Sequence, residues 1–322
     1  MPIAAGLKVA PPTPPVGPVP PPPSDAYDLS WTAPDGTVWP LMSAMLGWHL
    51  EDAISGVLGV VPVSVTTDPD PVGGSTVRHI QPQSRQMVIP IRIDGPAPAD
   101  HLVRYRQLAG AFSQTRRRGA GTLTLTRADG SARTIKAIYT AGFDPNAGNM
   151  SGWVYSDVVL SLFCPDPFWV DVEQITFART FASDPADFQD PYFTLSSSQT
   201  LGDTVVNNPG DAEAWADYVI TGPASLIVAT NNATGKVWSI DPNATALGFG
   251  RDLEADETVT ITSRPPSVRG PDGSVWTAAL GFPTQANLWP LEPGDNDITF
   301  AITGADDGTS ITGTFMARRE TP

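Results

Sequence analysis

Charged residues and cysteine are scarce in this sequence. Asp, Glu, Lys and Arg make up 16% of the 322 residues, and Cys164 is the single cysteine. One thiol excludes an intramolecular disulfide, and no apolar run reaches the roughly 18 residues of a membrane-spanning helix. Because charges are few while glycines number 29 and prolines 34, the composition favours many short strands with little helix.

Catalytic and metal-binding motifs are also missing. The histidines, His49, His79 and His101, have no Cys or carboxylate at the spacing of metal ligands. Cys164 lies between apolar and proline neighbours, which raise the pKa of a thiol rather than activate it. We therefore expect no enzyme activity, no metal and no cofactor.

The charge is unevenly distributed along the chain. Residues 1–163 contain 12 Lys/Arg and 12 Asp/Glu, whereas residues 164–322 contain 7 and 22, so the second half carries the whole net charge of -15. This asymmetry indicates a domain boundary near residue 164. It also argues against nucleic acid or an anionic membrane surface as the partner of the second half.

The boundary coincides with the segment LFCPDPFW at residues 162–169. Residues 153–163 alternate in the way of a strand with a buried face, and Pro165 and Pro167 end that strand. Phe168 and Trp169 are too apolar for an exposed corner. We expect both to pack back onto the first domain, near its helix.

The pattern predicts a mainly β protein with two domains. Residues 1–26 form a proline-rich extended arm, 27–170 an N-terminal β-sandwich with one helix, 171–200 a connection, and 201–322 a C-terminal antiparallel β-sandwich. The sequence Pro-Asp-Gly-Thr/Ser-Val-Trp occurs at 34–39 and again at 271–276, which predicts the same hairpin turn twice.

The helix is predicted at residues 98–118. We expect Asp100 to cap its N-terminus and the basic residues Arg116, Arg117 and Arg118 to lie at its C-terminal end, before Gly119. Its expected apolar stripe consists of Leu102, Tyr105, Leu108, Ala109 and Phe112. Together with the corner, the helix supplies the candidate interface or packing residues, which are Phe168, Trp169, Leu102, Tyr105, Phe112, Arg116, Arg117 and Arg118.

Several ordered motifs resemble those of phage tail proteins. The helix, the hairpins after it and the strand ending in FCPDPFW are similar to the end of the N-terminal domain of the distal tail proteins of long-tailed, non-contractile bacteriophages. The blocks VVNNPGDAEAWADYVITGP, LEADETVTITSRP and LWPLEPGDNDITFAI are similar, in the same order, to the C-terminal domain of minor tail proteins of phages that infect actinobacteria. The resemblance covers about residues 27–316 and does not extend to the proline arm.

The resemblance implies a structural protein at the distal end of a virion tail, made in the host cytoplasm. Such proteins form a ring of six copies from their first domains, and their second domains are jelly-roll or galectin-like sandwiches that project outward. The implied partners are further copies, the tail tube protein, the tail-tip hub protein, and receptor-binding or fibre proteins. The tape measure protein and DNA would pass through the channel without specific binding.

Two other functions are left open by the residues. A module that binds host cell-wall carbohydrate would use Trp215, Trp238, Trp276 and Trp289 as stacking platforms, although tryptophans in strands more often pack in cores. A glycan hydrolase would need two of the acidic residues of the second half to face each other across a sugar, and no motif places such a pair.

The proline arm predicts a contact between molecules. In the polyproline II conformation, the stretch from Ala10 to Ser24 reaches about 45 Å at ~3.1 Å per residue. Because the arm is already extended, it loses little conformational entropy on docking. We expect residues 1–24 to lie across a neighbouring ring subunit or an adjacent tail protein and to clamp the assembly.

Deleting residues 2–24 tests this clamp. We expect the two domains to fold as before, while the ring or its attachment to the tail becomes weaker. The measurement is the yield and tail-tip stability of virions that carry the deletion. Virions of normal yield and stability would show that the arm is dispensable.

Overall fold

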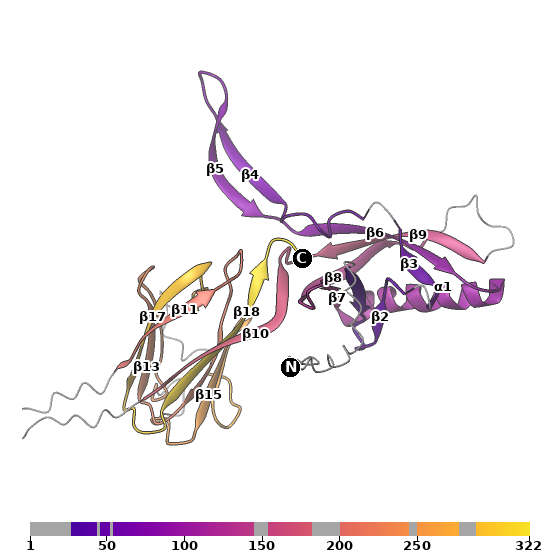
Figure 1. The fold of residues 1–322 in the computed structure, drawn as a ribbon. Helices are drawn as coiled ribbons and strands as arrows, with labels where there is room; N and C mark the ends of the chain where they lie inside the picture. The colour runs from indigo at the N-terminus through magenta and orange to yellow at the C-terminus, as the bar shows by residue number, and fades with distance from the viewer. Residues whose placement is uncertain are drawn as a thin grey trace, which may run out of the picture.

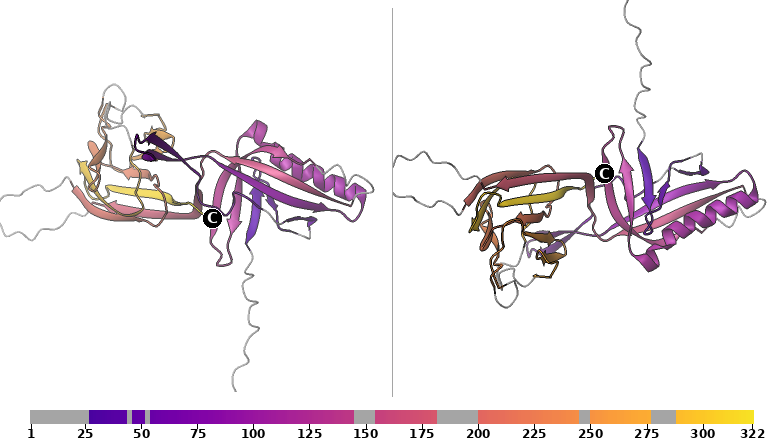
Figure 2. Two further views of the ribbon diagram at one scale, coloured as in Figure 1. Left: turned by 90° about the horizontal axis from the view of Figure 1, so that it is seen from above. Right: turned by 90° about the horizontal axis from the view of Figure 1, so that it is seen from below.

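The structure is a computed structural model that describes residues 27–43, 46–51, 54–144, 154–181, 200–244, 250–276 and 288–322. It is mainly β, with several antiparallel sheets and one long helix, as the sequence predicts. The elements form two bodies at opposite ends of an elongated molecule (Figures 1 and 2), each with its own hydrophobic core. No helix in these ranges is long and apolar enough to cross a membrane. The expected proline arm lies outside the described residues.

The first body consists of two layers of strands and a helix. The strands are β1 (Asp28–Thr32), β2 (Val38–Pro40), β3 (Trp48–Leu50), β4 (Val63–Pro69), β5 (Ser75–Pro82), β6 (Arg85–Asp94), β7 (Gly121–Thr126), β8 (Ala132–Gly142) and β9 (Tyr155–Cys164). Strand β8 joins the layers, because residues 132–137 pair with β7 and residues 138–142 pair with β9. Strands β4 and β5 pair only with each other among the described strands.

Strict alternation explains how β6 and β9 form the first core. Met87, Ile89, Ile91 and Ile93 of β6 are at most 1% exposed, and the residues between them face outward. β9 pairs along the whole length of β6 and buries its own alternate residues. Residues two apart lie on the same face of a sheet. The buried residues of β6 and β9 therefore lie on the face that the rest of the body covers.

The helix forms where the sequence predicts it, with two corrections. Helix α1 (Pro98–Ser113) begins after Ala97 rather than at an Asp100 cap, because Pro98 has the fixed backbone angle of a first helical residue. Asp100 lies in the first turn, where a negative charge favours the helix dipole. The short helix α2 (Thr115–Arg118) follows, and Gly119 ends it with a φ of 93°.

The second correction concerns the buried stripe of α1. Leu108 and Phe112 are buried as expected, and Tyr105 and Ala109 pack at the edge of the core. Leu102, however, is 44% exposed, and the buried residue in that turn is His101. His101 lies seven and eleven positions before Leu108 and Phe112, which is the repeat of one helix face, whereas Leu102 is rotated away by one residue.

The second body is a sandwich of two antiparallel sheets, also as predicted. One sheet contains β12 (Asp217–Thr221), β15 (Thr258–Ser263), β16 (Pro266–Arg269), β18 (Ser310–Arg319) and β10 (Trp169–Thr180). The other contains β11 (Thr200–Asn208), β13 (Leu226–Asn231), β14 (Lys236–Ile240) and β17 (Gly294–Thr303). Tyr218, Trp238 and Phe300 are fully buried between the sheets, with the rings of Tyr218 and Trp238 5.2 Å apart.

Strand β10 corrects the expected connection at 171–200. Its first residues, Trp169 and Val170, pair with the end of β18, and residues 174–180 pair with β18 in the second body. Phe177 lies opposite Gly313, where a Cβ atom would be 2.1 Å from the Phe177 ring. Residues 174–180 are therefore a strand of the second body, whereas Asp171 pairs with Arg133 of β8 in the first body. Residues 182–199 lie outside the described residues.

The repeated hexapeptide forms the same turn in both bodies. Asp35 accepts a hydrogen bond from the backbone of Thr37 at 2.9 Å, and Asp272 accepts one from the backbone of Ser274 at 2.9 Å. In each copy the glycine amide closes the turn onto the residue three positions earlier. The prediction of one hairpin chemistry used twice is confirmed.

Trp169 and Phe168 occupy different environments. Trp169 is fully buried in the first core, as predicted. Phe168 is only half-buried and lies under the guanidinium of Arg318, with 4.2 Å from Cζ to the ring centroid. The corner therefore contributes one side chain to the first core and one to the contact with the second body.

Replacing Trp169 tests the burial of the corner. We expect Trp169→Ala to lower the free energy of unfolding by about 3 to 5 kcal/mol, because a fully buried indole leaves a cavity. Urea denaturation measures the change. Val172→Ala on the same strand is the matched control, since Val172 is 53% exposed, and should change stability by less than about 0.5 kcal/mol. Equal stability of the two variants would contradict the assignment.

Candidate functional site at the junction of the two bodies

The corner after β9 faces the last strand of the chain. Pro165 and Pro167 interrupt the β-ladder, and Asp166 turns the chain by accepting a hydrogen bond from the backbone of Phe168 at 3.3 Å. Both carboxylate oxygens of Asp166 also accept from Nη2 of Arg318, at 2.6 and 2.8 Å. A charge-assisted contact of this length fixes the corner against β18.

Arg318 also lies between aromatic rings of both bodies. Its Cζ atom is 4.2 Å from the ring centroid of Phe168 and 5.2 Å from that of Trp215. Arg264 covers Trp215 at 3.4 Å, and burial together with the charge of Arg318 lowers the pKa of Arg264. Flat guanidinium groups suit such stacking, so aromatic and cationic groups alternate across the junction.

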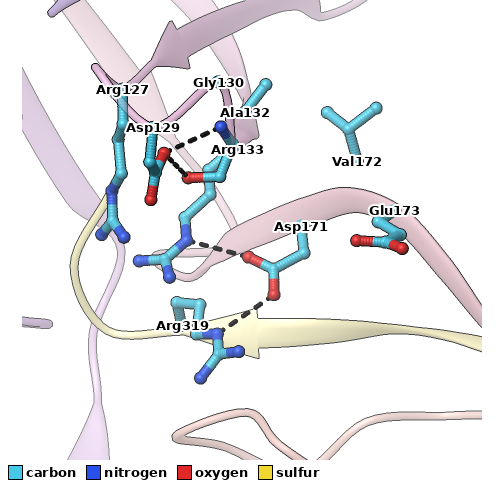
Figure 3. Close-up of a pocket in the computed structure, with 10 residues that line it drawn as sticks. Arg127, Asp129, Gly130, Ala132, Arg133, Asp171, Val172, Glu173 and Arg319 are labelled. Atoms are coloured by element: carbon cyan, nitrogen blue, oxygen red, sulfur yellow. Dashed lines mark hydrogen bonds and ion pairs between the residues drawn. The ribbon is translucent and has the colours of Figure 1, made fainter. Parts of the chain in front are cut away.

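Asp171 forms ion pairs that join three neighbouring strands, and we call this set of contacts the Asp171 bracket. Its Oδ1 accepts from Nε of Arg133 on β8 at 2.8 Å, and its Oδ2 accepts from Nε of Arg319 on β18 at 3.1 Å. Figure 3 shows the carboxylate of Asp171, on β10, between the two arginines. The three side chains are only 13%, 21% and 20% exposed, for Arg133, Asp171 and Arg319 respectively. Burial lowers the pKa of Arg133, and the charge of Asp171 opposes that change.

These groups border a hollow of about 490 Å³ (Figure 3). The lining is formed by Arg127, Asp129, Gly130, Ser131, Ala132, Arg133, Asp171, Val172, Glu173 and Arg319. Asp129 accepts hydrogen bonds from the side chain and backbone of Ser131, which lower its pKa. Arg127 donates to the carbonyl of Pro322, and Arg133 donates to that of Thr321 at 2.8 Å. These hydrogen bonds hold Thr321 and Pro322 against the first body.

Arg85 anchors the segment before β4. Arg85 is 2% exposed, and its Nη1 donates to the carbonyls of Gly56, Val57 and Gly59 at 3.2, 3.3 and 2.8 Å. Its Nη2 donates to the carbonyl of Glu320 at 2.7 Å. Burial lowers the pKa of Arg85. Carbonyl oxygens accept from Nη1 and Nη2, whereas the buried Nε has no hydrogen-bond partner among the described residues. One side chain thus joins the base of the β4–β5 hairpin to the end of β18.

Cys164 has the inert environment that the sequence predicts. It is fully buried, with its sulfur 3.8 Å from that of Met87. Burial raises the pKa of Cys164 to about 12. Among the described residues, no group of three or more His, Cys, Asp and Glu side chains is placed to hold a metal ion.

The predicted interface residues do not gather at one place. Phe168 reaches the junction, Trp169 lies in the first core, and Tyr105 and Phe112 belong to the packed face of α1. The exposed residues Arg116, Arg117 and Arg118 lie on α2. They take no part in the ion pairs of Asp166 and Asp171. Their role in an interface stays a prediction.

The predicted glycan platforms are corrected by burial. Trp238, Trp276 and Trp289 are at most 3% exposed and pack in the second core, so their ring faces cannot meet a sugar. Trp215 is half-buried and is covered by Arg264. The ring of Trp215 therefore does not present two open faces to a sugar.

The arginines and aspartates of the junction were not identified from the sequence. Their partners are 38 to 235 positions apart, so local spacing does not reveal them. One signal was present: the second half has 7 basic residues, and Arg264, Arg318 and Arg319 of these lie at the junction. When the few basic residues of an acidic domain lie close together, they indicate a site at which they form specific contacts.

Comparison with models of known protein families and with curated protein sequences finds no match. The fold, however, is similar to that of solved phage proteins. The crystal structure of the SPP1 Dit (gp 19.1) protein, described as a paradigm of the hub adsorption apparatus in phages infecting Gram-positive bacteria, matches with a TM-score of 0.62 at 15% identity. The match covers 91% of this chain and 99% of that one. A chain of the phage P2 baseplate, in its activated conformation with Ca, matches with a TM-score of 0.51 at 10% identity, over 92% and 99%.

Removing the carboxylate of Asp171 tests the bracket. We expect Asp171→Ala to lower the free energy of unfolding by about 1 to 3 kcal/mol, because two poorly exposed guanidinium groups lose their partner. Hydrogen exchange of the backbone of residues 169–173 should also become faster. Asp68→Ala is the control, since it removes an exposed pair with Arg78 and should cost less than about 1 kcal/mol. Unchanged hydrogen exchange of residues 169–173 in Asp171→Ala would show that Asp171 does not hold β10 against its neighbouring strands.

Proposed function

We propose that this protein is a structural component of a phage tail tip. Copies of the chain form a ring, with six copies as the resemblance implies, that joins the tail tube to the tail-tip hub and anchors receptor-binding or fibre proteins. The observation that carries the proposal is the fold likeness to the Dit protein, which extends over both bodies of this chain. The ordered sequence motifs point to the same class of protein.

The geometry of the junction supports this role. A fixed angle between the two bodies would suit a protein that holds other proteins at a tail tip. The bracket at Asp171, the stack at Arg318 and the shared strand β10 resist a change of that angle. Both oxygens of Asp171 accept from arginines, and burial raises the pKa of the Cys164 thiol, which disfavours the reactive thiolate. This chemistry favours a mechanical role over an enzymatic one.

The charge distribution supports a division of roles between the bodies. Residues 1–163 have 12 basic and 12 acidic residues, so first bodies can pack closely without net repulsion. Residues 164–322 carry the excess of acid and are best kept apart, on the outside of a ring. The tail tube and hub proteins are the proposed neighbours of the ring, and the tape measure protein and DNA would pass through its channel.

Carbohydrate binding by the second body receives no support from its tryptophans. Three of the four are buried and the fourth is covered by an arginine. Binding of receptor-binding proteins to the second body therefore stays the preferred proposal.

Native mass spectrometry of the full-length chain tests the ring. We expect a closed oligomer of six copies at micromolar concentration, because a head-to-tail contact between first bodies closes by rotation. The full chain is required, since a fragment ending at residue 170 lacks the β18 partner of β10 and the Glu320 carbonyl that binds Arg85. A chain that stays monomeric, and shows no ring in images of virion tips, would refute the proposal.

A further inference from the structure

The β4–β5 hairpin is a two-stranded ribbon that projects away from the rest of the first body and from the second body (Figure 1). Every side chain of the ribbon is exposed except the half-buried Asp68. An isolated two-stranded ribbon is at best marginally stable in water. A ribbon of this length needs a further surface to cover one of its faces.

The register of the ribbon separates an apolar face from a polar one. Val63 pairs with Pro82, Val65 with Ile80 and, after a bulge at Arg78, Thr67 with Val77. The alternate pairs are polar, with Ser64 opposite Gln81 and Thr66 opposite His79. Residues two apart lie on the same side of a strand, so the valines and the isoleucine share one face. We call it the apolar ribbon face, formed by Val63, Val65, Val77, Ile80 and Pro82.

Exposed apolar residues are concentrated at this ribbon and its base. Of the 24 exposed large apolar side chains among the described residues, eight lie between positions 54 and 80. They are Ile54, Leu58, Val60, Val63, Val65, Val72, Val77 and Ile80, each between 36% and 96% exposed. Exposed apolar side chains gathered on one element in this way are typical of an interaction site.

The ribbon is held in a fixed direction by its base. Arg85 binds three carbonyls of residues 56–59, just before β4. After β5, the backbone of Gln83 donates to the carbonyl of Pro62 at 2.7 Å, and its side chain donates to Ser64 at 3.0 Å. Because the base is ordered before any partner arrives, docking of the ribbon loses less conformational entropy.

Charge selects the surface that covers the apolar ribbon face. Asp68 and Arg78 neutralise each other across the strands, so the ribbon suits a partner surface of low net charge. The first body has such a surface, since residues 1–163 are balanced, whereas residues 164–322 have a net charge of -15. At the ribbon tip, Asp70 forms no ion pair with any described residue, and neither do Arg116 and Arg117 on α2 of the first body. A second copy can therefore match both the apolar face and the tip.

We propose that the apolar ribbon face packs against the first body of a second copy of this chain. The inference rests on the proposed ring and deepens it, because it names the element that makes the contact between neighbours. The two surfaces in contact are different, with the ribbon of one copy on the first body of the next. A contact of this type is head-to-tail, and it generates a closed ring when the rotation between neighbours closes.

Paired aspartate variants on the two faces of the ribbon test the contact. The variant Val65→Asp/Ile80→Asp places two charges on the apolar ribbon face, and Thr66→Asp/His79→Asp places the same charges one residue away, on the polar pair of Thr66 and His79. We expect the first to shift the concentration needed for ring formation upward by at least about tenfold, since buried carboxylates are strongly disfavoured. We expect the second to assemble as the wild type does. Circular dichroism and the melting temperature verify that both variants keep the fold.

The outcomes separate this contact from the ring itself. A wild-type chain that stays monomeric overturns the proposed ring and the contact together. Rings formed equally well by the wild type and by Val65→Asp/Ile80→Asp overturn the contact alone. A photoreactive amino acid at position 65 provides a second measurement, in which we expect crosslinks to residues 27–163 of another copy. Assembled rings that give no such crosslink, or crosslinks to residues 200–322, also overturn the contact.

Discussion

The pairing of β10 with both β8 and β18 is the constraint on which the rest of the structure depends. It extends one antiparallel path from β16 in the second body to β2 in the first. Asp171 secures the crossing, because its two carboxylate oxygens accept from arginines on the two neighbouring strands. A continuous sheet resists shear in its plane, so the bodies are joined by backbone hydrogen bonds as well as by side chains.

The corner at residues 164–168 follows from this crossing. The chain must leave the first sheet at Cys164 and re-enter the path at Trp169, and two prolines prevent the ladder from continuing in between. Asp166 and Phe168 both contact Arg318. The carboxylate of Asp166 accepts a hydrogen bond from it, and the ring of Phe168 lies against its guanidinium. The unusual composition of the corner is therefore explained by contacts with the far end of the chain.

Local patterns predicted much of the fold but little of the junction. The hairpin turns, α1 and strands such as β6 and β17 depend on neighbours within a few residues, which the sequence displays directly. Strand β10 was mistaken for a connection because Trp169 faces one core, Phe177 faces another, and the charged Asp171 lies between them. Its alternation is interrupted where the environment changes. The partners of Asp171 and Arg85 depend on the completed fold, which no local period encodes.

The buried guanidinium of Arg85 also orders events in time. Its hydrogen bonds join residues 56–59 to Glu320, which is 235 positions away. During synthesis, the amino-terminal partners leave the ribosome long before the carbonyl that completes the set. The bond from Nη2 to Glu320 can therefore form only after translation has passed β18. The link between the base of the hairpin and the end of β18 is therefore completed only after nearly the whole described chain has been made.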